Sequence, residues 1–175
     1  MKPSLLLLLW LTAVTPFAHA TDWLNWQKVG DASLTWGPFI VYTSQLRTPN
    51  GLYDGPKQSQ ALIITYQRNI SRDELIEATR DQWQAQGVFE REPQSNDWIR
   101  TLQSLWPNVS AGTQLAFVFS DKRGQFWYRE SAKHKSFTPL GPHQSEAFSS
   151  RFLGIWLDPH TQYPALRQQL IGGEE

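Results

Sequence analysis

Residues 115–128 read Leu-Ala-Phe-Val-Phe-Ser-Asp-Lys-Arg-Gly-Gln-Phe-Trp-Tyr, and this stretch sets the class of the fold. Leu115, Phe117 and Phe119 recur at every second position, which is the period of a β-strand with one buried face. The polar run at 121–124 is a turn signal, and the aromatic run at 126–128 predicts a returning strand. The stretch therefore predicts an antiparallel hairpin with a solvated, charged tip.

Three more strands are expected towards the N-terminus. Ala32, Leu34 and Trp36 alternate within 26–36, and Gly30-Asp31 interrupts this pattern as a β-bulge would. Gly37-Pro38 predicts a tight turn into a second strand that begins with Phe39-Ile40-Val41-Tyr42. After a loop over 48–57, the run Leu62–Tyr66 predicts a third strand that is buried on both faces.

Helical patterns fill the rest of the chain. Ser71 and Glu74 form the Ser-x-x-Glu signature of a capping box, and Gly87 marks the end of the helix that follows. Further helices are expected from about Ser95 to Pro107, around Phe148 to Ile155, and after Pro164. The segment 130–142, with its prolines, predicts a loop. Because the strands cluster in hairpins, the sequence predicts one α+β domain with a mainly antiparallel sheet.

The first twenty residues predict a secretory signal peptide rather than part of the fold. Lys2 precedes the apolar run Leu5–Val14, and Ala18-His19-Ala20 has the small-x-small pattern of a cleavage site. The apolar run is about half of the ~20 residues that a membrane span needs. We therefore expect cleavage after Ala20, a domain over 21–175 and, since cysteine is absent, export to a bacterial periplasm.

Composition excludes several classes of function. With 16 basic and 16 acidic side chains, the chain lacks the positive charge of a nucleic-acid binder. It has no Cys for a thiolate site, and His134, His143 and His160 lack metal-ligand spacing, so we expect no metal and no cofactor. The 13% aromatic content has two explanations, a core for a small domain or an apolar ligand cleft.

Two segments resemble the chalcone isomerase-like group of exported bacterial proteins. Gly30-Asp31-Ala32-Ser33-Leu34 with the strand Phe39–Leu46 resembles the start of that group. Phe152–Asp158, followed by Pro164-Ala165-Leu166-Arg167 and Leu170-Ile171-Gly172, resembles its C-terminal signature. The resemblance implies an open-faced β-sandwich, in which helices pack on one face of a large antiparallel sheet. It also implies either cyclisation of chalcones or, as in related members of the fold, binding of fatty acids.

Several positions depart from the enzymes of this group. Those enzymes carry a catalytic Arg before the strand that matches Phe39–Leu46, but the only cation in 21–46 is Lys28. Tyr42 stands where they have Thr, and a rough alignment puts Ser71 and Ala78 in place of their Tyr and Asn; Thr161 is a possible match for a C-terminal Ser or Thr. We therefore expect no chalcone isomerase activity.

Three functions stay open on the sequence alone. The first is binding of a small apolar or amphipathic ligand, such as a fatty acid, by Tyr42 with Trp36, Tyr66 and Arg47. The second is an envelope accessory protein that docks on a protein partner through exposed aromatic residues. The third is an isomerase or intramolecular lyase for another substrate, with Tyr42 or Lys28 as its acid or base.

We expect the C-terminal segment that resembles the family signature to have a structural role. Phe152, Ile155 and Trp156 share a helical stripe, which predicts that they pack as core and line little ligand surface. Trp156→Ala should then cost about 3–5 kcal/mol of stability, whereas Tyr42→Phe should cost little.

Overall fold

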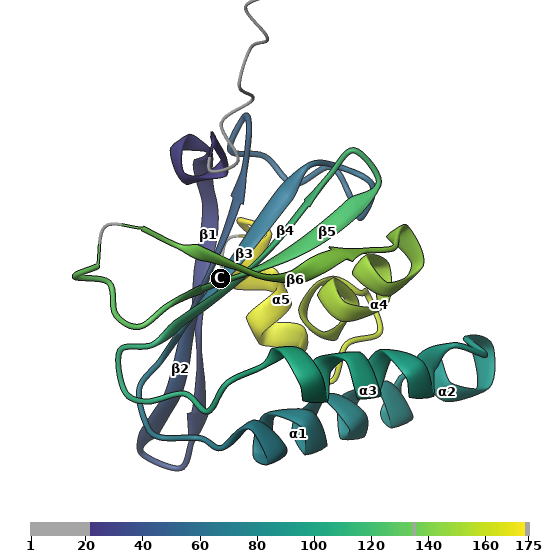
Figure 1. Ribbon diagram of the computed structural model, residues 1–175. Coiled ribbons are helices and arrows are strands. Elements are labelled where there is room, and N and C mark those ends of the chain that lie inside the picture. Colours follow the sequence, from purple (N-terminus) through teal and green to yellow (C-terminus); the bar gives the residue numbers. More distant parts are fainter. Residues whose placement is uncertain (1–21, 135, 174–175) are drawn as a thin grey trace, which may run out of the picture.

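A computed structural model describes residues 22–134 and 136–173; the expected signal peptide lies outside the described residues. Figure 1 shows a single antiparallel sheet with helices gathered against one of its faces. This arrangement confirms the α+β class and the open, helix-covered antiparallel sheet. The elements are η1 Asp22–Asn25, β1 Gln27–Trp36, β2 Phe39–Thr48, β3 Gln60–Tyr66, α1 Arg72–Ala85, α2 Val88–Arg91, α3 Ser95–Leu105, β4 Gln114–Ser120, β5 Arg123–Arg129, β6 Thr138–Gln144, α4 Glu146–Leu157 and α5 Pro164–Leu170.

The sheet is built by simple succession of its strands. The six strands of the described residues lie in the order β1-β2-β3-β4-β5-β6, and every neighbouring pair is antiparallel. The predicted hairpin is the pair β4–β5, in which Phe117 faces Phe126 across the strands. Asp121 and Lys122 at its tip have φ of 52° and 61°, as the tightest hairpin turns require.

The β1–β2 hairpin carries two irregularities. The expected interruption is present, because the register shifts between Lys28 and Gly30. At Gly30 helix α5 comes so close that a Cβ atom would lie 2.1 Å from the carbonyl oxygen of Gln169. The second shift leaves Val41 as the extra residue of β2, so that Leu34 pairs with Tyr42 and Thr35 pairs with Ile40.

Local signals place the helices where the sequence predicts them. The Ser71 hydroxyl accepts from the Glu74 amide, while the Glu74 carboxylate accepts from the Ser71 amide, so α1 has its capping box. Gly87 follows α1 with φ of 68°, and α3 ends directly before Trp106 and Pro107. The short helix α2 was not expected, since no element was predicted between Gly87 and Ser95.

The strand β6 corrects the expectation of a loop over 130–142. Thr138–Gln144 pairs with β5, with Leu140 opposite Phe126. Pro139 and Pro142 are tolerated there because β6 is an edge strand. One side of an edge strand has no neighbouring strand, so a proline, which lacks an amide hydrogen, costs no backbone hydrogen bond on that side. A proline-rich segment can therefore end a sheet, which its composition alone does not reveal.

The two faces of the sheet have different cores. The helix-covered face holds the larger core, in which Phe117, Phe126, Phe148 and Phe152 pack ring against ring. The opposite face has a smaller cluster in which Trp23 of η1 contacts Trp127 and Phe137. Among the described residues, no helix combines the length and apolar character needed to cross a bilayer.

Candidate functional site

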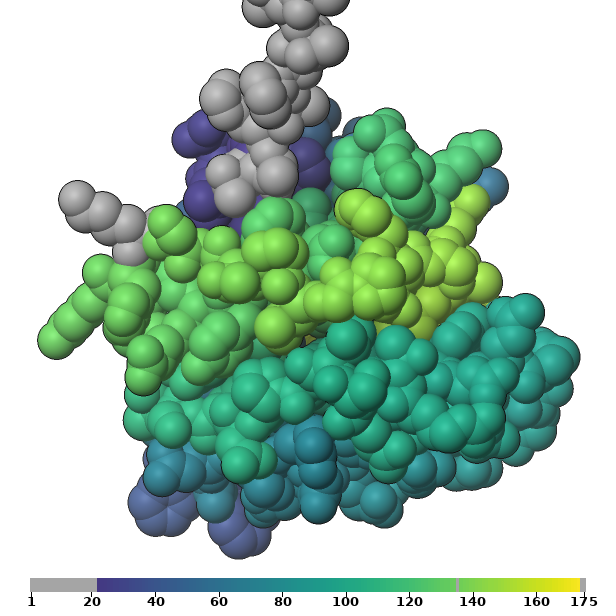
Figure 2. Space-filling model, in the orientation of Figure 1, coloured from purple at the N-terminus to yellow at the C-terminus, as the bar shows by residue number. Residues whose placement is uncertain are grey.

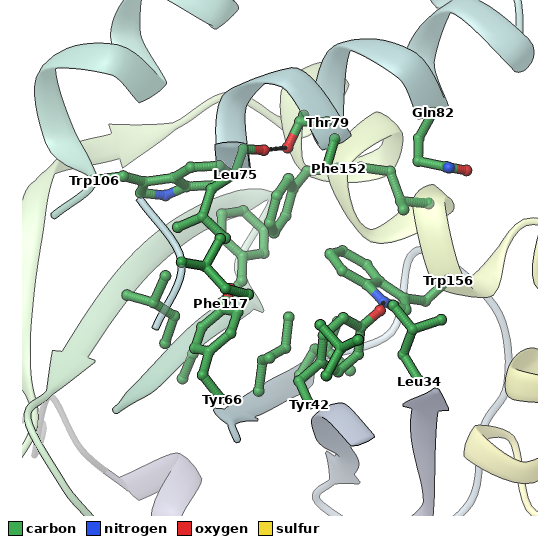
Figure 3. A pocket seen from close by; sticks show the side chains of 18 of the residues that line it. Leu34, Tyr42, Tyr66, Leu75, Thr79, Gln82, Trp106, Phe117, Phe152 and Trp156 are labelled. Carbon is green, nitrogen blue, oxygen red and sulfur yellow. Dashed lines mark hydrogen bonds between the residues drawn. The ribbon is translucent and has the colours of Figure 1, made fainter. Parts of the chain in front are cut away.

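An apolar cavity of about 150 Å³ lies between the sheet and the helices. Figure 3 shows side chains from the sheet and from the helices converging on it. In another protein an apolar cavity of similar volume holds a benzene-sized molecule. Its lining consists of Leu34, Val41, Tyr42, Leu62, Ile64, Tyr66, Ile70, Glu74, Leu75, Ala78, Thr79, Gln82, Trp106, Leu115, Ala116, Phe117, Phe126, Phe152, Ile155, Trp156 and Tyr163.

The cavity opens between α1 and the β1–β2 hairpin. Most of its lining is buried, but Glu74 and Ala78 on α1 are exposed, and Leu34 and Val41 on the hairpin are half-buried. Tyr163, which precedes α5, is half-buried at the same side. These side chains form the mouth, and the aromatic residues form the interior.

Two tyrosines from neighbouring strands form the floor. Tyr42 of β2 and Tyr66 of β3 lie directly opposite each other, with ring centroids 6.1 Å apart in an edge-to-face arrangement. Alternation along each strand points both rings to the helix-covered face. Both rings rise from the sheet into the cavity in Figure 3. Two of the four predicted ligand-binding residues are therefore brought together at one site.

A hydrogen bond joins this floor to the opposite wall. Trp156 Nε1 of α4 donates to Tyr42 Oη over 2.8 Å, and both groups are buried. Phe152, Ile155 and Trp156 all line the cavity. The block is buried, as expected for core. It also bounds the cavity, which was not expected, because a helical stripe that covers the sheet also bounds any space left between the two layers.

Burial moves the floor tyrosines, which are uncharged at neutral pH like any ordinary tyrosine, still further from ionisation. It raises the pKa of the Tyr42 hydroxyl far above its usual range, although the hydrogen bond from Trp156 opposes the shift. It raises the pKa of Tyr66 in the same direction, with a further contribution from Tyr42. Tyr42 is thus unsuited to act as a general base, because its phenolate is inaccessible near neutral pH.

Glu74 is the one carboxylate among the described residues that line the cavity. Its carboxylate accepts the Ser71 amide over 2.8 Å, and this hydrogen bond is the main reason that its pKa lies below 4.5. Nearby Arg68 contributes a smaller part of that shift. No Lys, Arg or His belongs to the lining formed by the described residues. The mouth of the cavity therefore carries a negative charge, whereas the interior is uncharged.

Three polar groups of the lining have no hydrogen-bond partner among residues 22–134 and 136–173. The indole Nε1 of Trp106 and the amide Oε1 of Gln82 are buried without one. The Tyr66 hydroxyl also lacks one, and its pKa shift has no contribution from a hydrogen bond. Thr79, by contrast, is satisfied by the Leu75 carbonyl within α1. The cavity thus offers hydrogen-bonding groups to a ligand.

The other two predicted ligand-binding residues lie elsewhere. Trp36 is at the end of the β1–β2 hairpin, where it pairs with Phe39 and is 71% exposed. Arg47 lies five residues after Tyr42 and thus points to the opposite face of the sheet. There its guanidinium donates to the Leu24 carbonyl and the Gln45 amide oxygen. Neither residue contacts the cavity.

Three of the positions that were compared with catalytic residues of the chalcone isomerases lie at or near the cavity. Ala78 and Tyr42 line it, and Ser71 caps the helix that forms its mouth. The Thr161 hydroxyl donates to the Ile155 carbonyl and so fixes the end of α4. Lys28 lies away from the cavity and pairs with Asp31, which removes the second acid or base considered from the sequence.

Sequence reasoning missed most of the cavity wall. Trp106, Phe126 and the side chains of α1 were not predicted to line a ligand site, and the α4 residues were predicted to pack as core. An apolar sequence pattern is the same whether a side chain lines a cavity or packs in a solid core, so the pattern does not distinguish the two. The described residues contain no group of three or more His, Cys, Asp or Glu suited to hold a metal ion.

Comparison with known proteins gives a relative but no family. No family model matches the chain. The chain is 27% identical over 172 residues to a protein of Haemophilus influenzae that is described as an uncharacterized protein. The match covers 98% of this chain and 78% of the relative. This chain is therefore similar along nearly its whole length to a bacterial protein.

Proposed function

We propose that this protein is an exported, periplasmic member of the chalcone isomerase-like group that binds a small apolar or amphipathic molecule without catalysing chalcone cyclisation. The observation that supports this function best is the cavity of about 150 Å³ under α1, with its aromatic lining and its unpaired hydrogen-bonding groups. Ligand pockets are typically apolar with a few convergent polar groups.

The size and chemistry of the cavity argue against chalcone cyclisation. A chalcone has two aromatic rings joined by a three-carbon chain, whereas the cavity has the volume that holds about one ring. Cyclisation also needs a positive group beside the developing negative charge. The lining includes no Lys, Arg or His of the described residues. An isomerase for another substrate would have to use the buried, neutral Tyr42.

The test is a calorimetric titration of the purified protein with benzyl alcohol, whose single ring matches the cavity. Ala78→Leu places a larger side chain at the mouth and should weaken binding by about tenfold or more, equivalent to ~1.4 kcal/mol. Ala147→Leu is the matched control, since Ala147 is an exposed helical alanine that does not line the cavity. Saturable binding that only Ala78→Leu weakens supports the proposal. Absence of binding, or equal effects of both variants, contradicts it.

A second function is favoured by a different observation, the exposed end of the β1–β2 hairpin. Trp36, Phe39 and Ile40 are 71%, 64% and 47% exposed, and the hairpin end protrudes at the lower left of Figure 2. Exposed aromatic residues are typical anchors for protein partners. Capture of one stoichiometric envelope protein by the parent, lost in Trp36→Ser with Phe39→Ser, would support an accessory role. Equal capture by both proteins would contradict it.

A further inference from the structure

The charge of the cavity defines the chemical class of its ligand. We infer that the ligand is a neutral molecule that presents a hydrogen-bond acceptor, such as an alcohol or a carbonyl compound, rather than a carboxylate such as a fatty-acid anion. This inference rests on the proposed function and narrows it. It follows from the placement of Glu74, Tyr66 and Trp106 around the cavity.

An anionic head group would find no charge to offset it inside the cavity. A buried carboxylate needs a cation or several strong donors, because leaving water is costly for an ion. The cations near the mouth do not meet this need: Arg68 is exposed and does not line the cavity, and Glu74, which does line it, is negative. A carboxylate at the mouth would therefore meet a like charge before it met a favourable one.

A neutral acceptor is complementary to the interior. The Tyr66 hydroxyl and Trp106 Nε1 are donors without a protein acceptor among the described residues, and both belong to the lining. Tyr42 lies beside Tyr66, and its hydroxyl accepts from Trp156 while its own O–H proton stays available to a ligand. An alcohol or carbonyl oxygen can accept from any of these donors at a much smaller desolvation cost than a carboxylate. The ring or chain of the ligand would pack on Phe117 and Phe152.

A ligand series that differs only in charge tests the inference. Benzyl alcohol, benzoate and benzylammonium share one ring and one substituent, and octan-1-ol with octanoate gives the matched pair for an acyl chain. Dissociation constants at neutral pH should favour each alcohol over its carboxylate by about tenfold or more, which corresponds to ~1.4 kcal/mol. Benzoate or octanoate that binds as tightly as its alcohol would overturn the inference while leaving the proposed function intact. If no member of the series binds, the proposed function itself fails.

Two variants with matched controls locate the effect. Tyr66→Phe should weaken benzyl alcohol binding by roughly 2- to 10-fold, the size of one neutral hydrogen bond. Tyr128→Phe is its control, because Tyr128 lies on the same face of the sheet and does not line the cavity. Equal weakening by both would overturn the role of Tyr66.

Glu74→Gln should reduce the ratio by which the alcohol binds more tightly than the carboxylate, because it removes the negative charge at the mouth of the cavity. The glutamine side chain can still complete the capping box, so the helix start should be kept. Glu77→Gln, an exposed position on the same helix outside the lining, should leave the preference as in the parent. An unchanged preference in Glu74→Gln would overturn the role assigned to that charge.

Discussion

Trp156 Nε1 donates a hydrogen bond of 2.8 Å to Tyr42 Oη, which ties helix α4 to strand β2 across 114 residues of sequence. Both side chains are buried, and both line the cavity. The bond satisfies an indole donor that would otherwise be orphaned in an apolar wall. Stability and the shape of the site therefore depend on the same pair of residues.

The pair should show energetic coupling. Tyr42→Phe leaves the Trp156 donor buried without an acceptor and should cost about 1–3 kcal/mol of unfolding free energy. This replaces the small cost expected from the sequence, which did not predict the hydrogen bond to Trp156. Trp156→Phe should cost stability through lost packing, and the double variant should cost less than the sum of the two, because the orphaned donor is then absent. Urea denaturation of the three variants and the parent measures this coupling. Strict additivity would contradict the hydrogen bond.

Trp156→Ala addresses the core role of the same residue. The indole packs against Phe152 with ring centroids 5.3 Å apart and is only 7% exposed. We still expect a loss of about 3–5 kcal/mol, the usual cost of deleting a large buried aromatic. Thermal melts of Trp156→Ala and of Trp36→Ala give the comparison, since the second residue is exposed and should change stability by roughly 0.5 kcal/mol or less.

Gly30→Ala should destabilise the protein through backbone crowding. The new Cβ would lie 2.1 Å from the Gln169 carbonyl oxygen and 2.7 Å from that of Leu170, so α5 would have to move away from β1. Overpacking of this kind costs about 1–3 kcal/mol or more. Gly154→Ala is the control within α4, where the nearest atom would be 3.6 Å away and a gain of up to ~1 kcal/mol is expected. Urea denaturation measures both variants, and equal midpoints of the two unfolding curves would contradict the close approach of α5.

Glu74 should make stability depend on pH. Its pKa is lower in the folded protein than its ordinary value of 4.5, chiefly because it accepts the Ser71 amide. A lowered pKa stabilises the fold above the unfolded-state pKa, and that stabilisation is lost as the pH falls through the folded-state pKa. Between neutral pH and acid below 4.5, the parent should thus lose more stability than Glu74→Gln. Identical losses in pH-dependent melts would show that the carboxylate is not held in the capping box.

Sequence patterns predicted the parts of the fold that local chemistry specifies. The capping box of α1, the charged β4–β5 turn and the helix end at Pro107 each depend on a few neighbouring residues, and each lies where it was expected. The edge strand β6 was missed because its prolines read as a loop, and only its position beside β5 makes them acceptable.

The candidate site was predictable only in part, for a geometric reason. Tyr42 and Tyr66 were proposed from the resemblance to enzymes with a cleft at this place, and both lie on strands that the sequence predicted. Alternation along β2 already separates Arg47 from Tyr42, so that error could have been avoided from the sequence. The contribution of α4 could not have been derived, because the distance between sheet and helix depends on how the whole core packs.

The most direct test of a neutral ligand bound in this cavity is an NMR titration of the tryptophan indole N–H signals with benzyl alcohol. Trp106 and Trp156 line the cavity, while Trp23 and Trp127 pack together on the opposite face of the sheet. Our account predicts saturable shifts of the Trp106 and Trp156 signals, no shift of the Trp23 and Trp127 signals, and much weaker shifts with benzoate. Unchanged Trp106 and Trp156 signals at saturating benzyl alcohol, or equal shifts with benzoate, would contradict it.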